Sequence, residues 1–415
     1  MAPTSRERVL AALDHKETDR PPVDLSGHRS SGIAAVAYAK LRRHLGLPER
    51  PIRVYDMVQQ LAVVDEDVLD LFGVDTIEMG RGFCDRDEDW KDWVLPDGTP
   101  CQIPAFISID RKGEDWFLRA QDGQELGIMK KGCLYFEQST FPLQERGIEA
   151  DDFSDLADIV GRTIWTGVPH PGAHLPLTEE GLAEMARRAA DLRRRTDRAI
   201  VGLFGGNMFE IPQMLYRMDN YLLAVGLHPD AVLRLSEALC AVHLNNLEKW
   251  MAAVGPSIDI VLFGDDLGGQ GGPLISPATY RTFYKPFHRR LWNRAKELAD
   301  VRIMLHCCGG VRELLPDFID AGLDAVNPVQ FNCTGMAVSE LKEEFGGRLC
   351  FWGGGCDTRF VLPSGTPVEV RRHVREQVDV LSSGGGFVFQ QVHNILADVP
   401  PENIVSMYRA LSGQE

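Results

Sequence analysis

Residues 301–310 read VRIMLHCCGG, an apolar run that ends abruptly in a histidine, two cysteines and two glycines. We interpret this stretch as a buried parallel strand that delivers ligand side chains at its carboxyl end. The glycines allow a sharp turn, and a helical pattern begins almost at once at Val311. Side chains at the end of such a strand are expected to face a cleft.

His306 and Cys308 are two residues apart in this stretch. On an extended chain their side chains leave the same face and can converge on one metal ion, whereas Cys307 points the other way. The pair alone is weak evidence for a metal. Buried cysteine is often a small hydrophobic residue, and a strand histidine is usually a hydrogen-bonded core residue.

Two later apolar runs also end in residues that can bind a metal. Cys356 follows the run 349–352 and three glycines. His393 follows the run 387–391. Histidine nitrogen and cysteine sulfur are ligands that suit zinc. The predicted zinc ligands are His306, Cys308, Cys356 and His393, and the sequence leaves open whether three or four of them bind.

The chain has 415 residues, of which 44% are hydrophobic and 25% charged, which is typical of a globular protein. Its 44 basic and 60 acidic residues give a net charge of −16 without a long basic cluster, so we expect no nucleic-acid partner. Nine cysteines, an odd number, indicate reduced thiols in the cytoplasm. No signal-peptide pattern or run of 18 apolar residues is present, so we expect no membrane association.

Eight apolar, strand-like runs alternate with helical stretches along residues 1–415. They are 22–25, 75–79, 199–204, 259–264, 301–305, 325–329, 349–352 and 387–391. This alternation predicts a single α/β domain, a (β/α)8 TIM barrel with its site at the carboxyl ends of the strands. A doubly wound open sheet is the alternative, but no G-x-G-x-x-G motif follows the first run.

Two further predictions concern the first third of the chain. Residues 84–143 contain short aromatic or β-branched runs separated by turn signals, which predict a β-meander inserted after the second strand. The insertion either covers the barrel edge or forms a lid over the site. Residues 55–71 are predicted to form a helix before the second strand.

Other strand ends carry polar residues. Asp265 and Asp266 follow one strand, and as a pair one of them could serve proton transfer, although each taken singly could equally cap a helix or tie a loop. They are the predicted catalytic residues. Four further residues are predicted to hydrogen-bond the substrate or to tie loops together: His28, Asn207, Gln270 and Gln330.

Taken together, these features resemble the uroporphyrinogen decarboxylase superfamily, and within it the zinc methyltransferases that move a methyl group between a corrinoid protein and a thiol. The resemblance covers nearly the whole chain. Its segments are RERV at 6–9, DRPPV at 19–23, GDD at 264–266, ISP at 275–277 and PPENI at 400–404. The pair His306 and Cys308 looks like the zinc half-site of that branch. Its third ligand is a cysteine after the last strand, where this chain has His393.

The resemblance implies a zinc-dependent methyltransferase that uses a small-molecule substrate. A corrinoid would be carried by a partner protein, because this chain lacks a D-x-H-x-x-G corrinoid-binding segment. A homodimer is compatible with this expectation. The first rival is decarboxylation of a tetrapyrrole through Asp24, Asp265 or Asp266. However, the decarboxylases carry an R-Q-A-G-R segment where this chain reads GHRSS at 27–31. A second rival is a zinc- or thiol-binding protein without catalytic activity.

Overall fold

The computed structural model describes residues 2–120 and 122–411 and has an α/β architecture built on a parallel sheet. Seven strands lie in the order β17-β16-β15-β14-β11-β10-β3, and all neighbours run parallel. The strands are β3 (Thr76–Glu78), β10 (Ala199–Gly205), β11 (Ile260–Gly264), β14 (Arg302–His306), β15 (Ala325–Asn327), β16 (Cys350–Trp352) and β17 (Phe387–Val388). They coincide with seven of the eight predicted runs.

The eighth run joins the two edges of this curled sheet. Asp24 N donates to the Phe389 carbonyl at 2.8 Å, and Phe389 N donates to the Pro22 carbonyl at the same distance. On the other side, Asp75 N donates to the Val23 carbonyl at 2.7 Å. The run therefore bridges β17 and β3, so the carboxyl ends of all eight runs gather at one rim, as in a TIM barrel.

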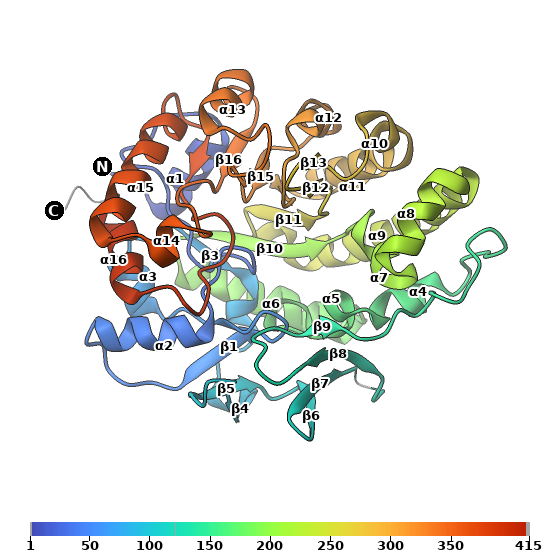
Figure 1. Cartoon of the computed structure of the whole chain (residues 1–415), viewed down its shortest axis with the longest axis horizontal. Helices are drawn as coiled ribbons and strands as arrows, with labels where there is room; N and C mark the ends of the chain where they lie inside the picture. The colour runs from blue at the N-terminus through green and yellow to red at the C-terminus, as the bar shows by residue number, and fades with distance from the viewer. Residues whose placement is uncertain (1, 121, 412–415) are drawn as a thin grey trace.

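Helices cover the outer side of the sheet, as Figure 1 shows for α10 to α13 and α15 around β11 to β16. The longer helices are α1 (Ser5–Leu13), α2 (Ala35–His44), α6 (Glu179–Arg195), α8 (Met218–Leu227), α9 (Pro229–Val254), α11 (Lys285–Leu298), α13 (Val338–Phe345), α15 (Pro367–Leu381) and α16 (Pro401–Arg409). The shorter ones are α3 (Glu66–Leu71), α4 (Leu156–Ile159), α5 (Ile164–Gly167), α7 (Glu210–Tyr216), α10 (Pro277–Phe283), α12 (Leu315–Ala321) and α14 (Val361–Ser364).

Local sequence signals set where several of these helices begin. Thr4 and Thr366 each accept the backbone N–H of a glutamate three residues later, and that glutamate side chain accepts the N–H of the threonine in return. Such capping boxes satisfy amide groups that the first helical turn leaves free. The start of α6 uses Thr178, whose side chain accepts from Gly181 N.

Helix α1 closes the end of the barrel that lies opposite the rim. Val9, Ala12 and Leu13 of α1 pack in one buried cluster with inward-facing side chains from the sheet strands. Those strand residues include Ile260, Met304 and Trp352, all fully buried. A second, larger cluster lies between the sheet and the surrounding helices. Because α1 fills the end of the barrel opposite the rim, the barrel interior can open only at the rim.

Two small β-sheets precede the main run of α/β units. Strands β1 (Ile52–Asp56), β2 (Leu61–Ala62), β4 (Trp90–Val94) and β5 (Pro100–Pro104) form one sheet. Strands β6 (Ser108–Lys112), β7 (Asp115–Arg119), β8 (Glu125–Met129) and β9 (Glu137–Gln138) form an antiparallel sheet in sequence order. A further two-residue hairpin pairs β12 (Gly268–Gly269) with β13 (Gly272–Pro273). That residues 84–143 are an insertion stays a prediction.

The predicted helix over residues 55–71 is wrong for most of its length. Residues 52–56 form β1, which pairs in parallel with β5, and helix α3 begins only at Glu66. Between them Gln60 adopts a left-handed backbone with φ of 52°, and Asp56 accepts the N–H of Gln59. Pairing with a strand more than forty residues away in the sequence overrides the local helical pattern.

Asp75 fixes the joint between the closing run and β3. It is fully buried and accepts hydrogen bonds from Arg8 Nη1 at 2.8 Å, from Arg20 Nη1 at 2.6 Å and from Val23 N at 2.8 Å. We predict that Asp75→Asn lowers the free energy of unfolding by about 3 kcal/mol, because it removes the buried anion that Arg8 and Arg20 share. Urea denaturation measures the change.

Asp19→Asn is the matched control, since Asp19 binds the same Arg8 at 2.7 Å but is 41% exposed. Its loss is expected to cost about 1 kcal/mol or less. Equal costs for the two substitutions would contradict the assignment of Asp75 as the anchor.

Candidate metal centre and substrate pocket

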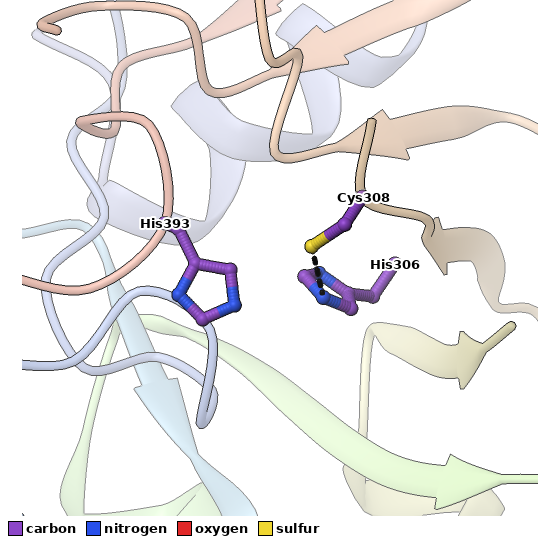
Figure 2. Close-up of side chains that lie close together, drawn as sticks. All are labelled: His306, Cys308 and His393. Atoms are coloured by element: carbon purple, nitrogen blue, oxygen red, sulfur yellow. Dashed lines mark hydrogen bonds between the residues drawn. The ribbon is translucent and has the colours of Figure 1, made fainter. Parts of the chain in front are cut away.

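Three predicted ligands converge at the rim of the barrel. One ligand atom from each of His306, Cys308 and His393 lies within 4.8 Å of the other two. His306 Nε2 is 3.3 Å from Cys308 Sγ, and the rings of His306 and His393 are 5.3 Å apart between centroids. Figure 2 shows the three side chains pointing toward one another. His306 ends β14, Cys308 follows it in the next loop, and His393 lies in the loop after β17. This is the only such group among residues 2–120 and 122–411.

The ring of His306 is held with Nε2 facing the centre. Its Nδ1 lies 2.7 Å from Asn327 Oδ1 at the end of the neighbouring strand β15. Asn327 Nδ2 donates to the main-chain carbonyl of Trp352, which can only accept, so Oδ1 must be the atom that faces His306. His306 therefore carries its hydrogen on Nδ1 and keeps a lone pair on Nε2 for an ion.

A second amide secures Asn327. Its Nδ2 also donates to Gln390 Oε1 at 2.7 Å, and Gln390 Nε2 donates to the Ser30 carbonyl at 2.7 Å. Both Asn327 and Gln390 are fully buried. The imidazole is thus oriented by a chain of side chains that is anchored on two main-chain carbonyls, those of Trp352 and Ser30.

Cys308 follows β14 on a backbone that Asp266 holds. Its N–H donates to Asp266 Oδ1 at 2.7 Å. Burial, together with the Asp266 carboxylate, raises the pKa of the Cys308 thiol well above its usual value, so without an ion the sulfur stays protonated. As predicted, Cys307 points elsewhere, and its buried sulfur accepts the N–H of Leu267 at 3.3 Å.

His393 is less well prepared as a ligand. Burial, together with His306 and His28, lowers the pKa of His393 to about 3, so its ring is neutral at pH 7. Its Nδ1 accepts the N–H of Asn394 at 2.9 Å, which places the hydrogen of the neutral ring on Nε2. Binding through Nε2 would require that hydrogen to leave, so His306 is the better-prepared nitrogen.

Cys356, the fourth predicted ligand, lies outside the group. It is fully buried, and its sulfur faces its own neighbour, the Asp357 carbonyl, at 3.9 Å. Gly353 and Gly354, with φ of 125° and 75°, turn the chain so that the thiol enters the core. Its carbonyl accepts the N–H of Val392 at 2.8 Å, so Cys356 supports the loop before His393 through its backbone.

The two predicted catalytic aspartates lie in different surroundings. Asp265 is fully buried and accepts the N–H groups of Phe209 at 2.8 Å and Glu210 at 2.9 Å, where α7 begins, with His288 Nε2 at 3.0 Å. This is the helix-capping role that the sequence left open. Asp266 lines the pocket, and its Oδ1 is 3.8 Å from His306 Nε2.

The four predicted substrate-binding residues also fall into two groups, one at the pocket and one in the surrounding loops. Asn207 lines the pocket. His28 is buried against Asp24, with Nε2 3.2 Å from Oδ2. Gln330 Oε1 accepts the N–H of Gly309, and Gln270 Oε1 accepts from Arg359 Nη1, each at 2.9 Å. His28, Gln270 and Gln330 therefore support loops around the site, whereas Asn207 faces the cavity.

A pocket of about 540 Å³ adjoins the three ligands. Its polar lining comprises Arg29, Ser30, Gln59, Thr166, His170, Asn207, Glu210, His243, Asn246, Asp266, His306 and His393. Its apolar lining includes Trp165, Leu203, Phe204, Met214, Trp250, Leu262 and Phe263. A half-apolar cavity with a few convergent polar groups is typical of a small-molecule site.

Sequence reasoning missed several residues of this lining, among them Glu210 and His243. Glu210 begins α7, three residues after Asn207, and could have been found by following the same strand end a little further. Burial raises its pKa well above the usual value, with the charges of Asp266 and Asp265 adding to the effect. His243 lies within α9, where no strand-end signal points to it, and burial lowers its pKa to about 4.

Comparisons with known proteins agree on a family. The family model described as uroporphyrinogen decarboxylase (URO-D) matches residues 180–413. Methylated-thiol–coenzyme M methyltransferase of Methanosarcina mazei is 31% identical over 141 residues, which are 33% of this chain and 34% of that protein. Uroporphyrinogen decarboxylase of Legionella pneumophila strain Lens is 26% identical over 186 residues, 44% of this chain and 47% of that protein. These matches therefore span about a third to a half of the curated relatives.

The likeness to a solved structure extends over almost the whole chain. A methyltransferase from Methanosarcina mazei aligns with a TM-score of 0.57 over 99% of this chain and 98% of that one. The sequence identity is 16%, so this likeness shows the fold alone. Within the described part of the chain, no helix combines the length and apolar character that a membrane crossing requires.

We predict that His306→Ala and Cys308→Ala each abolish tight zinc binding, because each removes one atom of the preformed pair. Cys307→Ala and Cys356→Ala should leave the zinc content unchanged, since both sulfurs face away from the group. Elemental analysis of the purified variants provides the measurement. Full zinc content in Cys308→Ala would refute the site.

Asn327→Ala tests the orientation of His306 separately from the ligands themselves. Loss of the Nδ1 partner should weaken zinc binding about 10- to 100-fold, a typical cost for removing a residue that orients a histidine ligand. Competition with a zinc-binding dye measures the affinity. Asn332→Ala is the control, because Asn332 is in the following loop and bonds Asp357 instead. An unchanged affinity in Asn327→Ala would show that the amide does not prepare the ligand.

Proposed function

The chain belongs to the uroporphyrinogen decarboxylase family, and on that premise we propose that it is a zinc-dependent methyltransferase. In this proposal it moves a methyl group between a small-molecule donor or a methylcorrinoid protein and a thiol or corrinoid acceptor. The observation that carries the proposal is the convergence of His306, Cys308 and His393 at one edge of a substrate-sized pocket.

The donor set fits zinc. Two imidazole nitrogens and one thiolate sulfur are ligands that zinc prefers, and three protein ligands leave a fourth position for a substrate atom. When bound, zinc would supply a Lewis acid that favours the deprotonated form of a thiol or polarises a methyl donor. His306 meets this requirement with the lone pair on Nε2 that Asn327 preserves.

The residues around the ligands have distinct tasks in this reaction. Asp266 accepts the N–H of Cys308 and so fixes the backbone that carries the sulfur. The apolar wall, including Trp250 and Phe263, would exclude water from the reacting atoms. A corrinoid would reach the rim on a partner protein, since the chain itself has no D-x-H-x-x-G segment.

Decarboxylation of a tetrapyrrole is less well supported by the pocket. Arg29 is the only arginine or lysine among the described lining residues, and its Nε lies 3.2 Å from the buried Asp56 carboxylate. A substrate with many carboxylates needs more cationic partners than this. Asp24 is also occupied, because Thr76 Oγ1 and Trp352 Nε1 both donate to it at 2.7 Å.

The test is methyl transfer by the zinc-loaded protein in both directions, from methylcob(III)alamin to thiols and from methyl donors to cob(I)alamin, followed by the absorbance of the corrinoid. We expect Cys308→Ala to lower the rate by more than about 100-fold and Cys307→Ala to change it little. Decarboxylation of uroporphyrinogen without methyl transfer would overturn the proposal in favour of the rival activity.

A further inference from the structure

Glu210 is a carboxyl group in the pocket to which the methyl-transfer proposal assigns no task. It is the first residue of α7 and lines the same cavity as His306, His393 and Asp266. Its Oε2 accepts a hydrogen bond from Asn207 Nδ2 at 2.7 Å. The backbone N–H of Asp266 also donates to its carboxyl group.

Three carboxyl groups meet at this point, and their partners differ. Asp265 receives N–H groups from Met208, Phe209 and Glu210, and His288 Nε2 lies 3.0 Å from its Oδ2. Asp266 receives the N–H of Cys308.

Glu210 receives two hydrogen bonds, from Asn207 Nδ2 and from the backbone N–H of Asp266, whereas Asp265 has four such partners. The charges of Asp266 and Asp265 oppose its ionisation, and burial opposes it most of all. Together these effects raise the pKa of Glu210 well above its usual value and favour the protonated carboxyl group.

The surroundings of Glu210 also indicate the shape of the group that it faces. Phe204 lies 5.6 Å from Phe263 and 5.7 Å from Trp250 between ring centroids, and all three rings line the cavity. Near them, the buried His243 Nε2 has no hydrogen-bond partner among the described residues. Such a wall suits an apolar ring that carries a polar substituent.

We propose that Glu210 is the catalytic acid of a demethylation reaction, in which it protonates the leaving oxygen of a methyl ether carried on an apolar ring. The inference rests on the proposed methyltransferase function and assigns its donor. A thiol acceptor must lose a proton, which a protonated carboxyl cannot take up. An ether oxygen must gain one, because an alkoxide or phenoxide is a basic leaving group.

The atoms and electrons balance as follows. The bond between the methyl carbon and the ether oxygen breaks, and the oxygen keeps its electron pair and takes the proton of Glu210. The methyl carbon forms a bond with cobalt(I) of a corrinoid on the partner protein, which supplies both electrons and becomes cobalt(III). The products are a phenol or alcohol and a methylcorrinoid, and the Glu210 carboxylate regains a proton from water.

Two ethers with the same ring shape but different leaving groups test this role. Zinc-loaded protein is given methoxybenzene or 1-methoxy-4-nitrobenzene, with cob(I)alamin as the acceptor. Glu210→Gln should lower the rate with methoxybenzene by about 100-fold or more. With the nitro compound it should lower the rate by less than about tenfold, because nitrophenoxide needs little protonation to leave. Glu180→Gln, at an exposed position, is the matched control.

The outcomes separate the two proposals. Equal losses with both ethers would overturn the acid role, since a structural defect does not depend on the leaving group. Transfer from methylcob(III)alamin to a thiol, with no transfer from either ether in wild type, would overturn the acid role and leave the methyltransferase function standing. No transfer in either direction would refute both.

A second measurement does not depend on activity. Infrared spectra of the protein at pH 7 should show the carbonyl band of a protonated carboxyl group that is lost in Glu210→Gln and kept in Glu180→Gln. Absence of that band in wild type would overturn the inference even if the variant were inactive. Circular dichroism of Glu210→Gln should match wild type, because glutamine can still accept from Asn207.

Discussion

A curled parallel sheet keeps its shape only if its two edge strands find partners, and a buried carboxylate fixes that closure here. Asp75 binds Arg8 and Arg20 while it accepts the N–H of Val23, so helix α1, the closing run and β3 share one anchor. Because the edges are joined, the carboxyl ends of sequence-distant strands come to the same rim. The convergence of His306 with His393 depends on this closure.

The rim is also where burial decides which groups carry charge. Burial lowers the pKa of His306 and raises that of the Cys308 thiol, so both ligands rest in their neutral forms. Without an ion, the pocket thus keeps its two nearest donors uncharged and hydrogen-bonded to each other at 3.3 Å. A cation that replaces the thiol hydrogen would find a lone pair of each within reach, and it would release one proton from the thiol.

Much of this arrangement could be predicted from the sequence, because apolar runs reveal strands and parallel strands place their ends together. That logic found the eight runs, the His306 and Cys308 pair, and His393. It could not tell in which direction a side chain leaves a glycine turn. Cys356 was therefore predicted to be a zinc ligand, whereas the structure places its thiol in the core. Nor could it see partners far away in the sequence, so it did not separate Asp265, which caps α7, from Asp266.

The ligands come from two separate places in the chain: His306 and Cys308 from one short segment, His393 from the loop after β17. An ion that binds all three would act as a cross-link between the two loops, which are otherwise connected through Asn327 and Gln390. Because the unfolded chain does not hold these atoms together, binding energy would add directly to the stability of this sector. Resistance of the barrel to heat would then vary with the supply of the ion, so availability of metal would govern how long the protein persists as well as how fast it works.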